Sequence, residues 1–390
     1  MKLKKLIDIF FVSLKLGFTS FGGPIAHLGY FHEEYIKRRR WLDEKTYADL
    51  VALCQFLPGP ASSQVGIGIG TIRGGMLGGL ISFIGFTLPS MLALIIFALF
   101  IDRFAFNESG FIHGLKLVAV AIVAHAIVGM SKTLTPDAPR KSIALFVMIG
   151  ILIWPSTITQ IVFIILAGIT GFLLYRNQDN TAETELKCPV SYKAGAICLS
   201  IFVILLITLP IVRAFFDIRW LAMFDSFYRA GSLVFGGGHV VLPLLEGEFV
   251  AEGLLTEDAF LTGYGAAQAV PGPLFTFASY IGTVIGGWSS GLLATVAIFL
   301  PAYLLVIGTL PFWNSIRRNP SITGALMGVN AGVVGLLIAA FYHPIWTSAI
   351  VKPQDFALSA LLFSMLAFWK IPVWLVVVAG AICGWLISFY

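Results

Sequence analysis

The amino-acid sequence predicts an all-α polytopic membrane protein built from two homologous halves of inverted topology, with broken or re-entrant helices. Three observations support this prediction. First, 58% of the 390 residues are hydrophobic and only 12% are charged, whereas soluble chains carry about 25% charged residues. Second, several apolar stretches reach the roughly 20 residues that a membrane-spanning helix needs. Third, a series of motifs from the first half of the chain recurs in the second half.

The charge pattern indicates membrane loops rather than a nucleic-acid surface. The net charge is +5, and the basic residues stand in short clusters beside apolar runs. Such clusters are typical of loops that stay in the cytoplasm. We therefore expect a lipid bilayer around the chain and no nucleic acid as a partner. The clusters lie at residues 2–5, 37–40, 140–141 and 317–318.

Several chemistries have no matching pattern in this sequence. The four cysteines form no C-x-x-C pair, so neither a disulfide framework nor a metal site is predicted. No phosphate-binding loop of the G-x-x-x-x-G-K type is present, so this chain does not drive transport with ATP. We expect no cofactor, no metal and no catalytic residue. A G-x-S-x-G match around Ser289 lies between two apolar segments and makes an intramembrane hydrolase a remote alternative.

An internal repeat organises the chain. The tetrapeptide beginning at Phe21 (FGGP) returns 214 residues later at Phe235 (FGGG). The hexapeptide beginning at Gln55 (QFLPGP) returns 213 residues later at Gln268 (QAVPGP). A near-constant spacing of this kind is the mark of two homologous units.

The repeat divides the chain into two units and a linker. We assign residues 1–175 to the first unit, 176–193 to a polar linker and 194–390 to the second unit. The apolar run at 194–212 has no counterpart in the first half, so we expect it to be an extra crossing helix. One unpaired crossing turns the second half upside down relative to the first, a plan common among secondary transporters.

Charge gives the expected orientation. Residues 37–40 are basic, whereas the equivalent region around Glu248 is acidic. Because basic loops stay inside, these two regions should face opposite sides. With re-entrant hairpins at 6–36 and 46–75 and at their repeats, nine crossings follow. The N-terminus is then cytoplasmic and the C-terminus outside.

The Gly- and Pro-rich breaks are the predicted substrate site. Non-helical backbone persists at membrane depth only where it is buried in protein or lines a wet cavity. Helix N-termini that follow such breaks offer free N–H groups and a positive dipole end to an anion. Packing kinks are the alternative, but four breaks in two symmetric pairs favour a site. The residues are Gly22, Gly23, Gly236, Gly237, Pro58, Gly59, Pro271 and Gly272.

Lys15 and Arg229 are the intramembrane cations with the strongest symmetry argument. They stand at equivalent positions, six residues before Phe21 and Phe235. A buried cation in a membrane is costly and usually functional, so both are expected to face one divalent oxyanion. The alternative is that each reaches an interface or pairs with a nearby carboxylate such as Asp8 or Asp225.

Two further symmetric pairs have polar side chains. Gln55 and Gln268 each precede a Pro-Gly-Pro motif by three residues, and an amide can donate to an oxyanion; an interhelical hydrogen bond is an equal alternative. Glu34 and Glu248 are candidates for a coupled proton. Their position at segment ends favours solvated loop-end residues instead.

Three unpaired residues complete the candidates. Arg73 stands beside Gly74 and is a candidate anion contact, although Ile285 replaces it in the second half. Lys116 either lines the pathway or extends to an interface. His239, directly after the second glycine break, is a candidate proton shuttle.

Taken together, the motifs resemble those of the chromate transporter family in its two-domain, long-chain form. The resemblance rests on Phe21–Pro24, the stretch ending Arg40–Glu44 (RWLDE), Gln55–Pro60 and their second copies, and it covers nearly the whole chain. It implies export of chromate across the bacterial inner membrane and chromate resistance. Sulfate is a related oxyanion, so a sulfate or other anion transporter is the first alternative and a passive channel is another. The sequence leaves the oligomeric state open, a homodimer included.

Overall fold

The computed structural model describes residues 2–21, 23–104, 110–175, 188–216, 218–235, 238–316 and 320–387, and these residues form helices and no strand. The helices of the first half are α1 (Lys2–Thr19), α2 (Gly23–Phe31), η1 (His32–Arg38), α3 (Glu44–Phe56), α4 (Ala61–Phe104), α5 (Gly110–Leu134), α6 (Ala138–Ile153) and α7 (Thr157–Tyr175). Helix α8 (Tyr192–Phe215) follows the linker. Residues 176–187, most of the predicted linker, lie outside the described residues.

The second half repeats this order of elements. Its main helices are α9 (Arg219–Leu233), η3 (Gly238–Val240), α10 (Val241–Phe249), α11 (Glu257–Ala269), η4 (Leu274–Thr276), α12 (Phe277–Thr309), α14 (Pro320–Ala340), α16 (Pro353–Ala367) and α17 (Val373–Ile387). Short turns η5 (Leu310–Phe312), α13 (Trp313–Ile316), η6 (Phe341–Trp346) and α15 (Thr347–Ala349) join them.

Equivalent helices begin with equivalent caps. Asp43 accepts a hydrogen bond from the Thr46 N–H before α3, and Thr256 accepts one from the Ala259 N–H before α11. Such caps satisfy an N–H that lacks an intrahelical partner. Each helix then ends at its Pro-Gly-Pro motif, because proline cannot continue a helix.

Helices α4 and α12 are hairpins rather than straight rods. Gly75 in α4 and Gly287 in α12 have φ of 71° and 79°, a left-handed conformation that glycine adopts without steric cost. The Ser82 hydroxyl donates to the Gly66 carbonyl at 2.8 Å, although sixteen residues of straight helix would separate them by about 24 Å. We call residues 61–74 the first arm of α4.

The segments before these arms also fold back, as the sequence predicts. A Cβ at Gly68 in the first arm would lie 2.6 Å from the Leu50 side chain of α3. Likewise, a Cβ at Gly263 in α11 would lie 2.1 Å from the Tyr280 ring in α12. Residues eight or nine positions before and after the central glycine of each Pro-Gly-Pro break therefore come close, which makes each unit a hairpin with its break at the tip.

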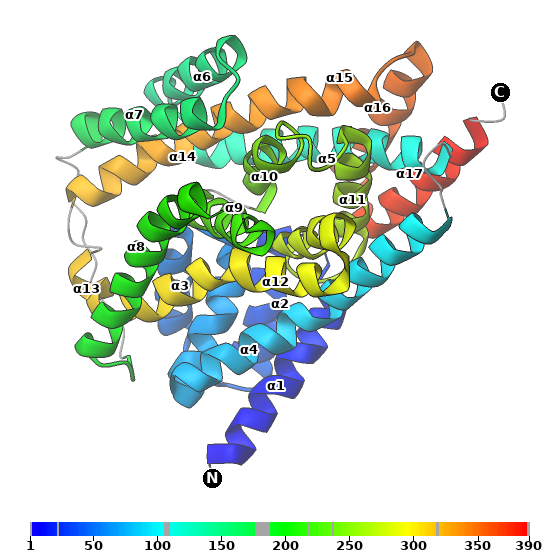
Figure 1. Cartoon of the computed structure of the whole chain (residues 1–390). Coiled ribbons are helices and arrows are strands. Elements are labelled where there is room, and N and C mark those ends of the chain that lie inside the picture. Colours follow the sequence, from blue (N-terminus) through cyan, green and yellow to red (C-terminus); the bar gives the residue numbers. More distant parts are fainter. Residues whose placement is uncertain are drawn as a thin grey trace.

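The two halves exchange their last helical hairpins. Helices α6 and α7 of the first half pack on α14 of the second, and α16 and α17 of the second half pack on α5 of the first (Figure 1). Glycines permit the close contact. A Cβ at Gly114 would lie 2.2 Å from the Gly380 carbonyl, and one at its equivalent Gly328 would lie 2.0 Å from the Ala167 carbonyl. Sequence analysis did not anticipate this exchange.

The protein is an all-α polytopic membrane protein. Among the described residues, five helical stretches are long and apolar enough to cross a membrane, including α8, which packs on α9 and α12. Two of the five, Ala61–Ile101 and Leu274–Phe312, contain the turns at Gly75 and Gly287. The division into two units, the side of each terminus and the number of crossings stay predictions.

Candidate functional site

The four backbone breaks meet in two pairs, each joining one half to the other. The Gly59 N–H donates to the Val234 carbonyl at 2.6 Å, and the Gly272 N–H donates to the Ser20 carbonyl at 2.9 Å. Val234 and Ser20 directly precede the phenylalanines of the two glycine motifs. The Pro-Gly-Pro tip of each half is therefore hydrogen-bonded to the glycine break of the other, so the breaks form one central region.

Glycine is required at these tips. Gly59 and Gly272 have φ of 118° and 108°, where a side chain is strained. A Cβ at Gly272 would also lie 2.8 Å from the Ser90 hydroxyl. Gly23 has φ of 80°, while Gly22, Gly236 and Gly237 lie outside the described residues. Pro58 and Pro271 are half-buried beside the tips.

A helix begins directly after the first tip, so its N-terminus lies there. The first arm of α4 begins at Ala61, directly after Pro60. The first N–H groups of a helix lack intrahelical partners, and the helix dipole places partial positive charge there. In the second half the equivalent start is the 3₁₀ turn η4, where the Thr276 hydroxyl donates to the Pro273 carbonyl.

The two predicted cations are each paired with a carboxylate of their own half. Lys15 donates to Glu34 at 2.8 Å, and Arg229 donates to Glu248 at 2.9 Å. These pairs are repeat equivalents. Both Lys15 and Arg229 therefore have a carboxylate partner. Their contact with substrate stays a prediction.

Each pair belongs to a larger cluster. The first ion-pair cluster has two carboxylates and four cations and a formal charge of +2; its members are Asp8, Lys15, Glu34, Arg38, Arg39 and Arg73. The second ion-pair cluster has two of each and no net charge; its members are Arg213, Asp225, Arg229 and Glu248. The second is also more enclosed, with the Asp225 side chain 1% exposed.

Glu34 and Glu248 differ from what their sequence position favours. Both are buried, at 6% and 8% exposure, so the interpretation as solvated loop-end residues is wrong. The chain folds back after α1 and after α9, which brings Glu34 next to Lys15 of α1 and Glu248 next to Arg229 of α9. Glu34 lies outside the five candidate spans. Burial raises its pKa, but the hydrogen bonds from Lys15 and Arg39 outweigh this and hold the pKa of Glu34 below its usual value.

The glutamine candidates occupy different surroundings. Gln55 is exposed on α3, while Gln268 is half-buried with its amide nitrogen 3.5 Å from His239 Nδ1. His239 also hydrogen-bonds the Tyr264 hydroxyl at 2.7 Å. The structure therefore gives Gln268 and His239 shared polar surroundings in the second half that Gln55 does not have.

Arg73 and Lys116 both have partners. The Arg73 guanidinium lies 4.2 Å from the Trp41 ring centroid and 3.6 Å from Asp8. Lys116 is buried on α5 and donates to Asp258 at the start of α11. The latter contact ties the two halves together and neutralises the buried ammonium.

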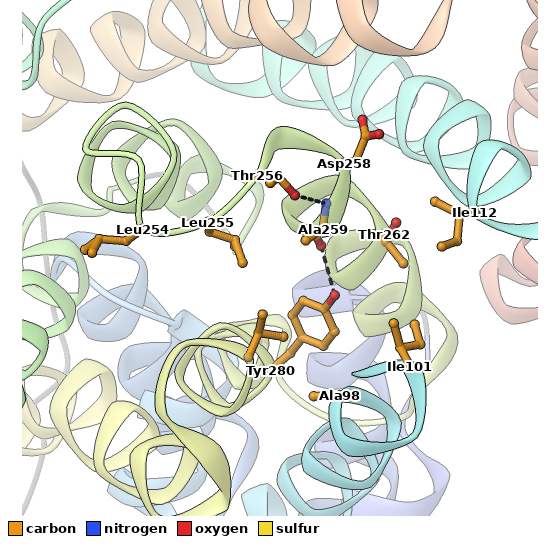
Figure 2. Close-up of a pocket in the computed structure, with 11 residues that line it drawn as sticks. Ala98, Ile101, Ile112, Leu254, Leu255, Thr256, Asp258, Ala259, Thr262 and Tyr280 are labelled. Atoms are coloured by element: carbon orange, nitrogen blue, oxygen red, sulfur yellow. Dashed lines mark hydrogen bonds between the residues drawn. The ribbon is translucent and has the colours of Figure 1, made fainter. Parts of the chain in front are cut away.

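A cavity of about 460 Å³ opens beside Asp258. Its lining is largely apolar and comes from α4, α5, α11, α12 and the loop before α11. Figure 2 shows Asp258 at the edge, with its carboxylate turned away from Tyr280. At the repeat equivalent of the lining residue Ile101 stands Trp313, which is 4% exposed and packs on Phe56. The second half of the chain thus has a large, buried ring where the first half has Ile101, which borders an open cavity.

Sequence analysis missed a group of buried polar residues at the first tip. We call Ser20, His27, Ser63 and Gln64 the first-half polar cluster. The available signal was the triplet Ser62–Gln64 directly after Pro-Gly-Pro-Ala, which reads Phe-Thr-Phe in the second half. A polar triplet is unexpected at the start of an otherwise apolar helix, which made it a signal for a polar site.

The comparisons with known proteins agree with this duplicated architecture. A family model described as "Chromate transporter" matches residues 7–172 and 221–385. An uncharacterized transporter of Methanocaldococcus jannaschii is 26% identical over 98% of this chain and 94% of its own length. The chromate transport protein of Pseudomonas aeruginosa is 27% identical over 96% of this chain and 90% of its own length. That of Cupriavidus metallidurans is 24% identical over 98% and 92%. No solved structure matches the chain.

Proposed function

The chain belongs to the chromate transporter family, and on that premise we propose that it is a secondary transporter that exports chromate across the bacterial inner membrane. The observation that supports this most is the meeting of the four breaks, each tip hydrogen-bonded to the opposite half. A site shared by two halves changes its access when one half moves against the other, which is how repeat-built transporters work.

The substrate chemistry follows from the backbone. Chromate is a tetrahedral dianion, so a site needs hydrogen-bond donors and positive potential rather than a shape-specific apolar pocket. The first arm of α4 supplies a positive helix end at the Gly59 tip. We assign substrate contact to the breaks, with Lys15, Arg229, Gln55 and Gln268 as second candidates and His239 as a coupling candidate.

The charge difference between the two ion-pair clusters supports export. The first cluster carries +2 and adjoins the basic residues 37–40, which are expected in the cytoplasm. The second carries no net charge. A positive entrance raises the local concentration of an anion, and a neutral exit releases it. An inside-negative potential adds about 2.3 kcal/mol per charge per 100 mV in the outward direction.

Flux through proteoliposomes tests the function. Purified protein is reconstituted and vesicles are loaded with radiolabelled chromate, with a potassium gradient and valinomycin setting the potential. We expect saturable chromate efflux that rises with inside-negative potential and disappears in the Gly59→Val variant. Efflux equal to that of protein-free vesicles would remove chromate as the substrate.

Sulfate is the second candidate, because it has the same shape and charge as chromate. The same vesicles with unlabelled sulfate as competitor separate the two. A sulfate inhibition constant below the chromate KM would assign the site to sulfate. The hydrolase alternative loses support, since Ser289 lies on a helix two residues after the Gly287 turn and not on a strand-turn-helix elbow.

A further inference from the structure

The first-half polar cluster is buried and incompletely hydrogen-bonded. Ser20, His27, Ser63 and Gln64 are each at most 1% exposed. One polar atom of each lacks a hydrogen bond of good geometry within the described residues; these atoms are Ser20 Oγ, His27 Nε2, Ser63 Oγ and Gln64 Oε1. The His27 ring also has a weaker interaction with the Ser20 backbone. Buried polar groups in proteins are almost always paired, so unpaired ones call for an explanation such as an absent ligand or water.

Contacts place the cluster beside the start of the first arm, between the first tip and the second. His27 Nδ1 lies 3.2 Å from the hydroxyl of Ser62, the neighbour of Ser63. Gln64 donates its amide N–H to the Pro58 carbonyl at 2.7 Å. The Ser20 carbonyl accepts from Gly272. The cluster therefore surrounds the N-terminus of the first arm, where the glycine break, the first tip and the second tip converge.

Phe86 closes this region on one side. The His27 ring lies 5.5 Å from the Phe86 ring, and a Cβ at Gly272 would lie 3.6 Å from the Phe86 carbonyl. The next residue, Thr87, also has a buried hydroxyl without a partner. Phe86 thus links His27 to the second tip at Gly272.

The fold does not require these polar groups. In the second half their repeat equivalents are Val234, Val241, Thr276 and Phe277, all buried. Three are apolar, and the Thr276 hydroxyl is satisfied by the Pro273 carbonyl. The equivalent region of the second half is therefore formed with paired or apolar side chains, and the first half has a costly arrangement for another reason.

We propose that the first-half polar cluster is a single, asymmetric binding seat for a tetrahedral oxyanion. Ser20 and Ser63 donate their hydroxyl protons, and the N–H groups at the start of the first arm donate to the same anion. In the tautomer whose Nδ1 accepts from Ser62, His27 Nε2 carries a proton and donates it as a third side-chain hydrogen bond. This inference deepens the proposed function and rests on it.

Gln64 gives the seat an acceptor. Its amide nitrogen donates to the Pro58 carbonyl, and its buried Oε1 has no partner within the described residues and is free to accept from a water that accompanies the anion. No Lys or Arg belongs to the cluster, and Lys15 is paired with Glu34. Neutral donors and a helix end hold an anion without the strong attraction of a fixed cation, which suits a transporter that must also release it.

Substitutions of the donors test the seat in the full-length protein. Ser63→Ala and His27→Phe remove one donor each with little change in shape, while His27→Gln keeps a donor near the Nε2 position. Thr276→Val is the matched control, because it removes the equivalent hydroxyl, which already has an intramolecular partner. The readouts are the chromate KM in proteoliposomes and the rise in melting temperature with sodium chromate against sodium chloride at equal ionic strength.

We expect Ser63→Ala and His27→Phe to raise the chromate KM about tenfold or more, the usual effect of losing a hydrogen bond to a charged ligand. His27→Gln should recover most of this affinity, and Thr276→Val should stay within about twofold of wild type. Should Ser63→Ala not yield folded protein, Ser63→Cys replaces it, with a weak donor of similar size.

Two failures are distinguishable. Wild-type affinity in Ser63→Ala and His27→Phe, with wild-type flux intact, would mean that the cluster holds water only and would overturn the seat. Absence of chromate flux in the wild type would instead overturn the proposed substrate. In that case a sulfate-induced rise in melting temperature that Ser63→Ala abolishes would still support an oxyanion seat.

Discussion

The two halves have similar backbone geometry at equivalent positions but differ in the side chains that these positions have. Both have a left-handed glycine at the Pro-Gly-Pro tip, a hairpin turn in the long helix and a glycine contact in the exchanged hairpin. At the tips, however, the first half has Ser63 and Gln64 where the second has Thr276 and Phe277. The backbone geometry of the two halves is alike at the positions where packing depends on it, whereas the side chains at the tips differ.

The ion-pair clusters show the same divergence in charge. The first cluster has a formal charge of +2 and several partly exposed cations, including Lys15 at 46% exposure. The second is neutral, and its carboxylates are nearly inaccessible. Both clusters contain the equivalent ion pair, Lys15–Glu34 or Arg229–Glu248, and differ in the charged residues around it. The two clusters of a symmetric scaffold thus differ in net charge and in exposure.

The largest effect is expected where the halves are still alike. Gly114→Ala and Gly328→Ala each place a methyl group within 2.2 Å of a backbone carbonyl, so both should destabilise the protein, by about 2–3 kcal/mol or more. Gly129→Ala on the same helix as Gly114 is the control, because nothing lies within 4 Å. It should be neutral or stabilising by up to about 1 kcal/mol. Unfolding in detergent by denaturant measures all three.

This prediction is wrong if only one of the two substitutions lowers the free energy of unfolding. A loss in Gly114→Ala without one in Gly328→Ala would show that the exchanged hairpins are not energetically equivalent. The comparison between halves would then extend to packing as well as chemistry.

The next prediction compares how much a carboxylate of each ion-pair cluster contributes to stability. Asp225→Asn leaves two arginines beside one buried glutamate, so we expect a loss of about 3 kcal/mol. Asp8→Asn in the first cluster removes a carboxylate that is 37% exposed, and solvent screening should keep its effect below about 1 kcal/mol. Denaturant unfolding at two salt concentrations measures both. Equal losses would mean that the clusters do not differ in burial as the structure indicates.

The open cavity offers a third comparison. Ile101→Trp places in the first half the ring that Trp313 provides in the second, so it should narrow the cavity of about 460 Å³. If this cavity is part of the anion path, chromate flux falls about tenfold or more with little change in melting temperature. Leu99→Trp, at a site that is 43% exposed, is the control. Unchanged flux in Ile101→Trp would place the cavity off the path.

The sequence was sufficient for the parts that depend on backbone chemistry. Repeated glycine and proline motifs located the breaks, the hairpin tips and the fold class, since those residues permit few conformations. The pairing of Lys15 with Glu34 was not predicted, because it depends on how closely the hairpin returns along α1. The exchange of α6–α7 with α16–α17 was missed for a related reason: glycines at 114 and 328 permit close contact but do not specify a partner.

The smallest expected effect is a difference in pH-dependent stability between two aspartates at helix N-termini, Asp137 and Asp355. Hydrogen bonds from Arg140 hold the pKa of Asp137 below its usual value. Burial raises the pKa of Asp355, but hydrogen bonds from His113, Lys352 and Val351 outweigh it, so this pKa is also lowered. A lowered carboxyl pKa contributes stability that is fully present above the unfolded value of about 3.9 and is lost as pH falls through the folded pKa.

Both aspartates therefore stabilise the protein at neutral pH, but not equally. Asp355 is 4% exposed and ties α16 to α5 through His113. Asp137 is 39% exposed and bonds mainly to Arg140 in its own helix, with a longer hydrogen bond of 3.3 Å from the Tyr175 hydroxyl in α7. We expect Asp355→Asn to lower the melting temperature at pH 7 more than Asp137→Asn, with both differences shrinking below about pH 4. Melting curves from pH 7 to pH 3 measure this. A difference that persists unchanged at pH 3 would show that the Asp355 contribution comes from its shape rather than from its charge.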